Sequence, residues 1–209
     1  MKGKTRTGLF VAHRLSVCLI VLAYSGNNSY AGQLQEADWF HPPKEFQRRS
    51  EESLNRPGVQ PLVSMVLPNF EAVWIEPKSS SMIVMGRTIL DAPQVRGLTK
   101  TSFLKSVDAI GKGYKLKLEA QRQGCQSSYR ISNMANMIVL TVTASFPDVS
   151  DDTIHHRYAI FYRADYRLDV VVEASGRAMA TFEPALTESV VDFLNELTRK
   201  YPSGIGFQG

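Results

Sequence analysis

The stretch Met137-Ile-Val-Leu-Thr-Val-Thr-Ala-Ser-Phe146 decides the fold, because apolar and polar side chains alternate along most of it, from Leu140 to Phe146. Successive residues of a β-strand point to opposite faces of the sheet. The apolar side chains on one face are Ile138, Leu140, Val142, Ala144 and Phe146, and the polar ones opposite are Thr141, Thr143 and Ser145. Alternation of this kind is typical of an antiparallel sheet with one face covered and one face in water.

The chain on both sides of this stretch shows further strand patterns. Tyr158, Ile160 and Tyr162 alternate with arginines, and a similar alternation follows after Tyr166. Short turns rich in proline, such as Pro68-Asn69, separate the strands upstream and indicate hairpins. The additional strands expected are 62–67, 70–76, 81–88, 157–163 and 166–174.

Two amphipathic helices are expected. The first spans Thr99 to Ile110 and is predicted to stop at Gly111, because glycine is common just past a helix end. The second spans Pro184 to Lys200, with acidic residues early and basic residues late, which suits the helix dipole. Its apolar stripe is predicted to cover the apolar face of the sheet.

This order of elements predicts an α+β fold in a single domain, with a mainly antiparallel sheet covered by two helices. The domain is placed at residues 62–200, after an N-terminal arm at 32–61 and before a loose tail at 201–209. Trp39, Phe40 and Phe46 are expected to tie the arm onto the domain, since exposed aromatic side chains are costly.

Residues 1–31 have the pattern of a cleavable export signal. Four basic residues precede or flank the start of the apolar run from Leu15 to Ala23, and Ser29-Tyr30-Ala31 places small residues where a signal peptidase reads. The run is too short to span a membrane, which needs about 20 apolar residues. We therefore expect cleavage after Ala31, no stable membrane span in the mature form, and a periplasmic or secreted protein.

Removal of this signal changes the charge of the chain. The full sequence has 24 Lys and Arg against 20 Asp and Glu, and the signal holds four of the basic residues and no acidic one. The mature chain is therefore formally neutral, which argues against a nucleic-acid partner. Only Cys125 remains as a cysteine, so no intramolecular disulfide is expected.

The element order resembles the superfamily that contains PsbP, the extrinsic photosystem subunit, and the DcrB-like periplasmic proteins. The resemblance covers residues 62–197 and rests on the Tyr-rich strand pair from Arg157 to Ala174, followed by Phe182 and a Val/Phe/Leu helix. It implies a sheet flanked by helices and a non-enzymatic role in binding or assembly. No functional residue is carried over from it.

Several carboxylate and imidazole side chains gather in one loop between two strands. Ligands of these types suit a divalent transition metal or, for the carboxylates alone, calcium. The spacing matches no zinc or EF-hand signature, and adjacent histidines at a strand start point to opposite faces, so a solvated hairpin loop is the competing interpretation. The candidate metal ligands are Asp148, Asp151, Asp152, His155 and His156.

Other segments have a chemical interpretation and a structural one. Cys125 is a candidate nucleophile if the fold brings a histidine to it, and otherwise a small buried side chain or one half of an intermolecular disulfide. Gly111-Lys112-Gly113 could suggest a phosphate-binding loop. Such a loop precedes a helix, whereas this segment follows a predicted one, so a helix end is favoured. The aromatic residues from Tyr158 to Tyr166 could form a stacking platform, although core packing is favoured at strand spacing.

The sequence contains no catalytic signature and predicts no cofactor. The leading hypothesis is an exported non-catalytic module that binds a protein partner. The contact is placed on the N-terminal arm or on a sheet face bearing Thr141, Thr143, Arg167 and Asp169. The alternatives are a metal-binding protein or metal-dependent hydrolase using the 148–156 loop, and a periplasmic inhibitor or immunity-type protein.

Overall fold

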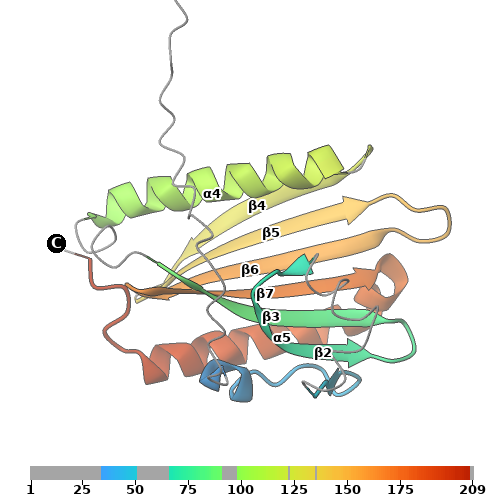
Figure 1. Cartoon of the computed structure of the whole chain (residues 1–209), viewed down its shortest axis with the longest axis horizontal. Helices are drawn as coiled ribbons and strands as arrows, with labels where there is room; N and C mark the ends of the chain where they lie inside the picture. The colour runs from blue at the N-terminus through green and yellow to red at the C-terminus, as the bar shows by residue number, and fades with distance from the viewer. Residues whose placement is uncertain (1–33, 51–65, 91–97, 122, 135, 208–209) are drawn as a thin grey trace, which may run out of the picture. The chain divides into compact units, whose positions relative to one another are not determined.

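The alternating stretch forms the strand β5 (Ile138–Phe146) of a seven-stranded sheet in a computed structural model of the chain (Figure 1). The structure describes residues 34–50, 66–90, 98–121, 123–134 and 136–207. The predicted signal (1–31) and most of the predicted strand 62–67 lie outside these residues.

The sheet is antiparallel throughout, with the strand order β1-β2-β3-β7-β6-β5-β4. Within the described residues it is accompanied by two α-helices, α4 and α5, which confirms the predicted α+β class. The strands are β1 (Gln47–Arg48), β2 (Phe70–Glu76), β3 (Ser81–Ile89), β4 (Gln126–Asn133), β5, β6 (Thr153–Arg163) and β7 (Tyr166–Ser175). The helices are α4 (Lys100–Gln121), α5 (Gly176–Lys200) and the short 3-10 helix η1 (Gln35–Asp38).

The two helices cover opposite faces of the sheet, so the prediction of one covered face is wrong. Helix α5 packs on the face that carries Val139 of β5, Ile160 of β6 and Val170 of β7. The apolar set of β5 points to the other face, where Gly111 of α4 lies against Leu140. The apolar side chains of β5 and β7 thus serve two different cores, which alternation along single strands does not reveal.

Helix α4 does not end at Gly111 but continues to Gln121. A Cβ atom at Gly111 would lie 2.5 Å from the ring of Tyr129 and 3.0 Å from Leu140. Glycine is therefore required here by close packing of the helix on β4 and β5, and not by a helix end.

Helix α5 begins at Gly176, eight residues before the predicted start at Pro184. The Ser175 hydroxyl caps the helix by accepting a hydrogen bond from the Ala178 amide at 3.2 Å. The buried stripe already begins with Met179 and Phe182, so packing against the sheet compensates for a proline inside the helix.

The described part of the N-terminal arm, residues 34–50, packs into the core on the α5 face, as its aromatic residues predict. Phe40 is 2% exposed and Phe46 is 6% exposed, and their rings make edge contacts with Phe193 and Phe182 of α5. The residues after α5 are also packed, since Ile205 is 3% exposed and the Phe207 ring contacts Phe103. The expectation of a loose tail is therefore wrong for residues 201–207.

The sequence predicts no stable membrane span in the mature form, and the length and hydropathy of the helices can be compared with that prediction. Among the helices of the described residues, none combines the length and apolar character that crossing a bilayer demands.

Candidate functional site

The three carboxylates among the candidate metal ligands take separate partners in the structure. Asp148 accepts a hydrogen bond from the Val149 amide at 2.6 Å. Asp151 accepts from the Arg177 amide, 3.2 Å from its Oδ2, and so helps to cap α5. Asp152 accepts from the Ser145 hydroxyl at 3.0 Å. The three carboxylates thus organise the turn and the helix start.

His155 and His156 point to opposite faces of the sheet, as their adjacency in a strand predicts. His155 Nδ1 lies 2.9 Å from Glu173 Oε1 on the α4 face. His156 lies on the α5 face, where burial lowers the pKa of its imidazole. In the parts of the chain that the structure describes, no three His, Cys, Asp or Glu side chains are grouped so that they could hold a metal ion. The metal site stays a prediction.

Cys125 lies just before β4 and is partly buried. Burial, with a smaller effect from Glu119, raises the pKa of its thiol. A nucleophilic cysteine needs the opposite shift, because the thiolate is the reactive form. The environment of Cys125 therefore favours the structural interpretation.

The sheet face proposed from sequence for partner binding does not exist as one surface. Thr141 and Thr143 lie on the α5 face, whereas Arg167 and Asp169 lie on the α4 face, and Asp169 is fully buried. Arg167 Nε is 2.9 Å and Arg157 Nε is 3.3 Å from the Asp169 carboxylate. The two arginines make this a buried ionic cluster.

Tyr114 of α4 covers the ionic cluster. The guanidinium of Arg157 lies 4.4 Å from the centre of the Tyr114 ring, within the range of a cation–π contact. Burial lowers the pKa of Arg167, but the Asp169 charge and hydrogen bonds to Asp169 and Tyr114 outweigh it, so the net pKa is raised. Arg167 therefore stays charged, and the cluster joins the helix to the sheet.

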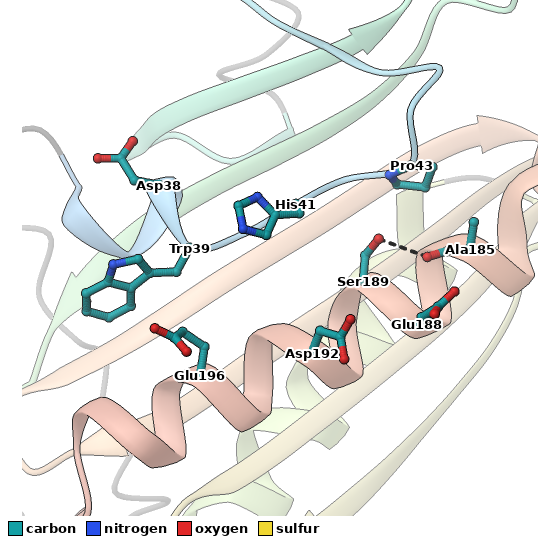
Figure 2. A pocket seen from close by; sticks show the side chains of 9 residues that line it. All are labelled: Asp38, Trp39, His41, Pro43, Ala185, Glu188, Ser189, Asp192 and Glu196. Atoms are coloured by element: carbon teal, nitrogen blue, oxygen red, sulfur yellow. Dashed lines mark hydrogen bonds between the residues drawn. The ribbon is translucent and has the colours of Figure 1, made fainter.

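A groove with a volume of about 500 Å³ lies between the N-terminal arm and α5 (Figure 2). Glu188, Asp192 and Glu196 project from α5 on one side of it, while Trp39 and His41 come from the arm on the other. We call these three carboxylates the acidic ridge. The full lining is Asp38, Trp39, His41, Pro43, Ala185, Glu188, Ser189, Asp192 and Glu196.

The acidic ridge is only partly neutralised. Arg199 donates two hydrogen bonds to Glu196, at 3.0 and 2.6 Å, and they hold the pKa of Glu196 below its usual range. Glu188 and Asp192 have no ion-pair partner among the described residues. Like charges four residues apart destabilise a helix by about 0.2–0.5 kcal/mol per pair. The ridge therefore costs α5 stability and would be relieved by a positive charge in the groove.

A buried carboxylate fixes the arm wall of the groove. Glu36 is 4% exposed and accepts hydrogen bonds from the hydroxyls of Tyr162, at 2.7 Å, and Tyr201, at 3.0 Å. Burial, together with the charge and hydrogen bond of Glu36, raises the pKa of Tyr162. The Tyr201 ring in turn contacts Trp39, with ring centres 6.0 Å apart. These core contacts hold the arm in place on its side of the groove. A partner that binds there need not pay the entropy of ordering the arm.

Sequence reasoning placed the arm among the possible contact regions but did not find the groove. The recurrence of Glu188, Asp192 and Glu196 every four residues is a signal that the sequence contains. The position of the arm opposite this ridge depends on contacts of Glu36 with residues more than 100 positions away.

Comparison with known proteins adds no family to this description. No protein-family model matches the chain, and a search of curated proteins found no match.

Proposed function

We propose that this chain is an exported, non-catalytic binding module whose arm–α5 groove takes a cationic segment of a protein partner. The observation that carries the proposal is the acidic ridge, because Glu188 and Asp192 face the groove without an ion-pair partner among the described residues. A lysine or arginine side chain of the partner would relieve their repulsion.

The export part of this proposal rests on residues 1–31, which carry the charge and hydropathy pattern of a signal. Cleavage after Ala31 leaves two residues before Leu34, which is 1% exposed. The arm wall would then begin almost at the mature N-terminus. A role in binding or assembly also agrees with what the resemblance to the PsbP and DcrB superfamily implies.

The test uses the two tryptophans of the chain, Trp39 and Trp74. Trp39 lines the groove and is partly exposed, whereas Trp74 is 3% exposed. The mature protein is titrated with a short lysine–serine peptide and with its glutamate–serine counterpart while tryptophan fluorescence is recorded. We expect a saturable change with the lysine peptide alone, weakened by added salt.

The double variant Glu188→Gln, Asp192→Asn should weaken this binding by about tenfold, because it removes the uncompensated charge. Glu183→Gln is the matched control, since Glu183 is an exposed acid of the same helix outside the groove. Equal binding of both peptides, or equal weakening by the control, would contradict the proposal.

A further inference from the structure

The strand β4 forms one edge of the sheet (Figure 1). It pairs with β5 over eight consecutive residue pairs, from Gln126↔Ser145 to Asn133↔Ile138, without a shift in register. No strand of the described residues pairs with its outer side. The opposite edge is different, because β1 has only two residues.

The hairpin fixes which backbone groups of β4 point outward. The Met134 amide donates to the Met137 carbonyl at 2.9 Å, so these two residues form a hydrogen-bonded pair. Such pairs alternate with non-hydrogen-bonded pairs along an antiparallel ladder. The residues at even positions of β4 therefore bond to β5. The amides and carbonyls that face away from the sheet are those of Ser127, Tyr129, Ile131 and Asn133.

An edge of this kind is a template for another strand unless it is protected. Natural proteins protect edges with bulges, prolines, inward-pointing charges or very short strands. The strand β4, Gln-Ser-Ser-Tyr-Arg-Ile-Ser-Asn, has no proline and no bulge against β5, and its single charged residue is Arg130. Within the described residues the edge is thus unpaired along its whole length and lacks proline and bulges.

The surroundings of this edge carry a net positive charge. Helix α4 lies over β4, where Ser127 Oγ donates to Glu119 at 2.9 Å and the Tyr129 hydroxyl donates to Asp108 at 2.8 Å. The helix has five lysines and two acids. On this part of it Lys112 pairs with Asp108 at 2.7 Å and Lys115 pairs with Glu119 at 3.8 Å, so the excess positive charge of the helix comes from its other three lysines, which are exposed. Arg130 is exposed on the other side of the strand.

We propose that the β4 edge docks an extended segment of a partner protein that carries acidic side chains. The segment would add to the sheet as an antiparallel strand, hydrogen-bonded to the four outward-facing residues. Its alternate side chains would meet the lysines of α4 on one side and Arg130 on the other. This site goes beyond the proposed function, because it has the opposite charge preference to the groove. It also lies at the other edge of the sheet from β1, the strand that the arm contributes.

A second copy of the chain is a poorer occupant of the same edge. In an antiparallel pairing of two β4 strands through their outward residues, pairing centred on Arg130 places Arg130 directly opposite its own copy. Like charges opposite each other destabilise a strand pair. Any such pairing also brings together two α4 helices that each carry three more lysines than acids.

The binding test uses a labelled threonine–glutamate peptide, which favours an extended strand and is acidic, with threonine–lysine and proline-interrupted versions as controls. Fluorescence anisotropy of the mature protein should show binding of the acidic peptide at least about tenfold tighter than of either control. The double variant Glu188→Gln, Asp192→Asn should leave this binding unchanged, which separates the edge from the groove.

Amide hydrogen exchange locates the peptide. Residues 127, 129, 131 and 133 should become protected when the acidic peptide is added, while the amides of β1 at the other edge should not change. Protection elsewhere, or binding without protection of these four amides, would overturn the proposal. Protection that rises with protein concentration in the absence of peptide would show that a second copy occupies the edge, and would also overturn it.

Ile131→Pro supplies an independent variant. It removes one outward amide without removing a bond to β5, a position at which edge strands tolerate proline. Peptide binding should fall by about tenfold, whereas Ile131→Val keeps the amide and should bind as the unchanged protein does. Equal binding by both variants would overturn the proposal. Should Ile131→Pro fail to fold, the exchange experiment on the unchanged protein decides.

Discussion

The two faces of the sheet are built differently. The α5 face holds one large apolar cluster that the arm, the sheet and α5 share, and that includes Phe40, Trp74, Phe182 and Phe193. On the α4 face, a cluster around Leu67 and Val171 lies at the β2–β3 end of the sheet. The contacts of α4 lie at the β4–β5 end, and the charged residues of β6 and β7 lie between the two regions.

This difference assigns different roles to the two helices. Helix α5 buries six apolar side chains of its stripe, whereas α4 buries only Phe103, Val107 and Leu118 besides Gly111. Burial of a large apolar side chain stabilises a protein by about 1.5–3 kcal/mol. The α5 face should therefore supply most of the stability, and the α4 face should depend on polar contacts and close backbone approach.

Phe193→Ala is expected to cause the largest loss, because its ring is 1% exposed and contacts Phe40 across the arm–helix junction. The cost should be about 4 kcal/mol, from lost burial and the cavity that remains. Urea denaturation measures it. Val191→Ala is the control on the same helix, since Val191 is 50% exposed and its loss should stay within about 0.5 kcal/mol. Similar losses of stability for both variants would contradict the view that burial on the α5 face supplies most of the stability.

Asp169→Ala tests the ionic cluster of the α4 face. It leaves Arg157 and Arg167 together without the carboxylate between them, which should cost about 3 kcal/mol. Asp165→Ala removes a carboxylate from a half-exposed pair with Arg163 and should cost less than about 1 kcal/mol. A small loss for Asp169→Ala would mean that the cluster does not hold this face together.

Gly111→Ala and Gly113→Ala should change the stability of the protein in opposite directions, although the two glycines are only two residues apart in α4. The Cβ atom that Gly111→Ala adds would meet the Tyr129 ring and destabilise the protein by about 1–2 kcal/mol. Nothing lies within 4 Å of a Cβ at Gly113, so alanine there should stabilise by up to about 1 kcal/mol through helix propensity. Thermal unfolding of both variants checks the sign.

The smallest effect concerns pH and the α5 face. Burial lowers the pKa of His156 in the folded protein below its ordinary value of 6.5. The unfolded chain therefore binds a proton first as pH falls, so this residue makes stability decrease below about pH 6.5 and has no such effect above it. His156→Gln should flatten that part of a stability–pH curve. An unchanged slope would show that His156 is not held neutral by this face.

The sequence predicted elements best where local pattern and tertiary contacts agree. The expected strands 70–76 and 81–88 match β2 and β3 closely, because turn residues bound them. Prediction failed at Gly111 and Pro184, where local preference favoured a helix boundary. Contact with Tyr129 in one case, and continuation of the buried stripe through Phe182 in the other, overrode that preference.

The candidate site shows the same division. The sequence by itself determined the α+β class, the antiparallel pairing of neighbouring strands and the spacing of the acidic ridge on α5, since all three follow from side-chain periodicity over short distances. Only the tertiary structure decided which face each strand buries, that Arg167 and Asp169 lie inside, and that Glu36 holds the arm opposite the ridge. Those features depend on contacts between residues far apart in the chain, and local periodicity carries no information about them.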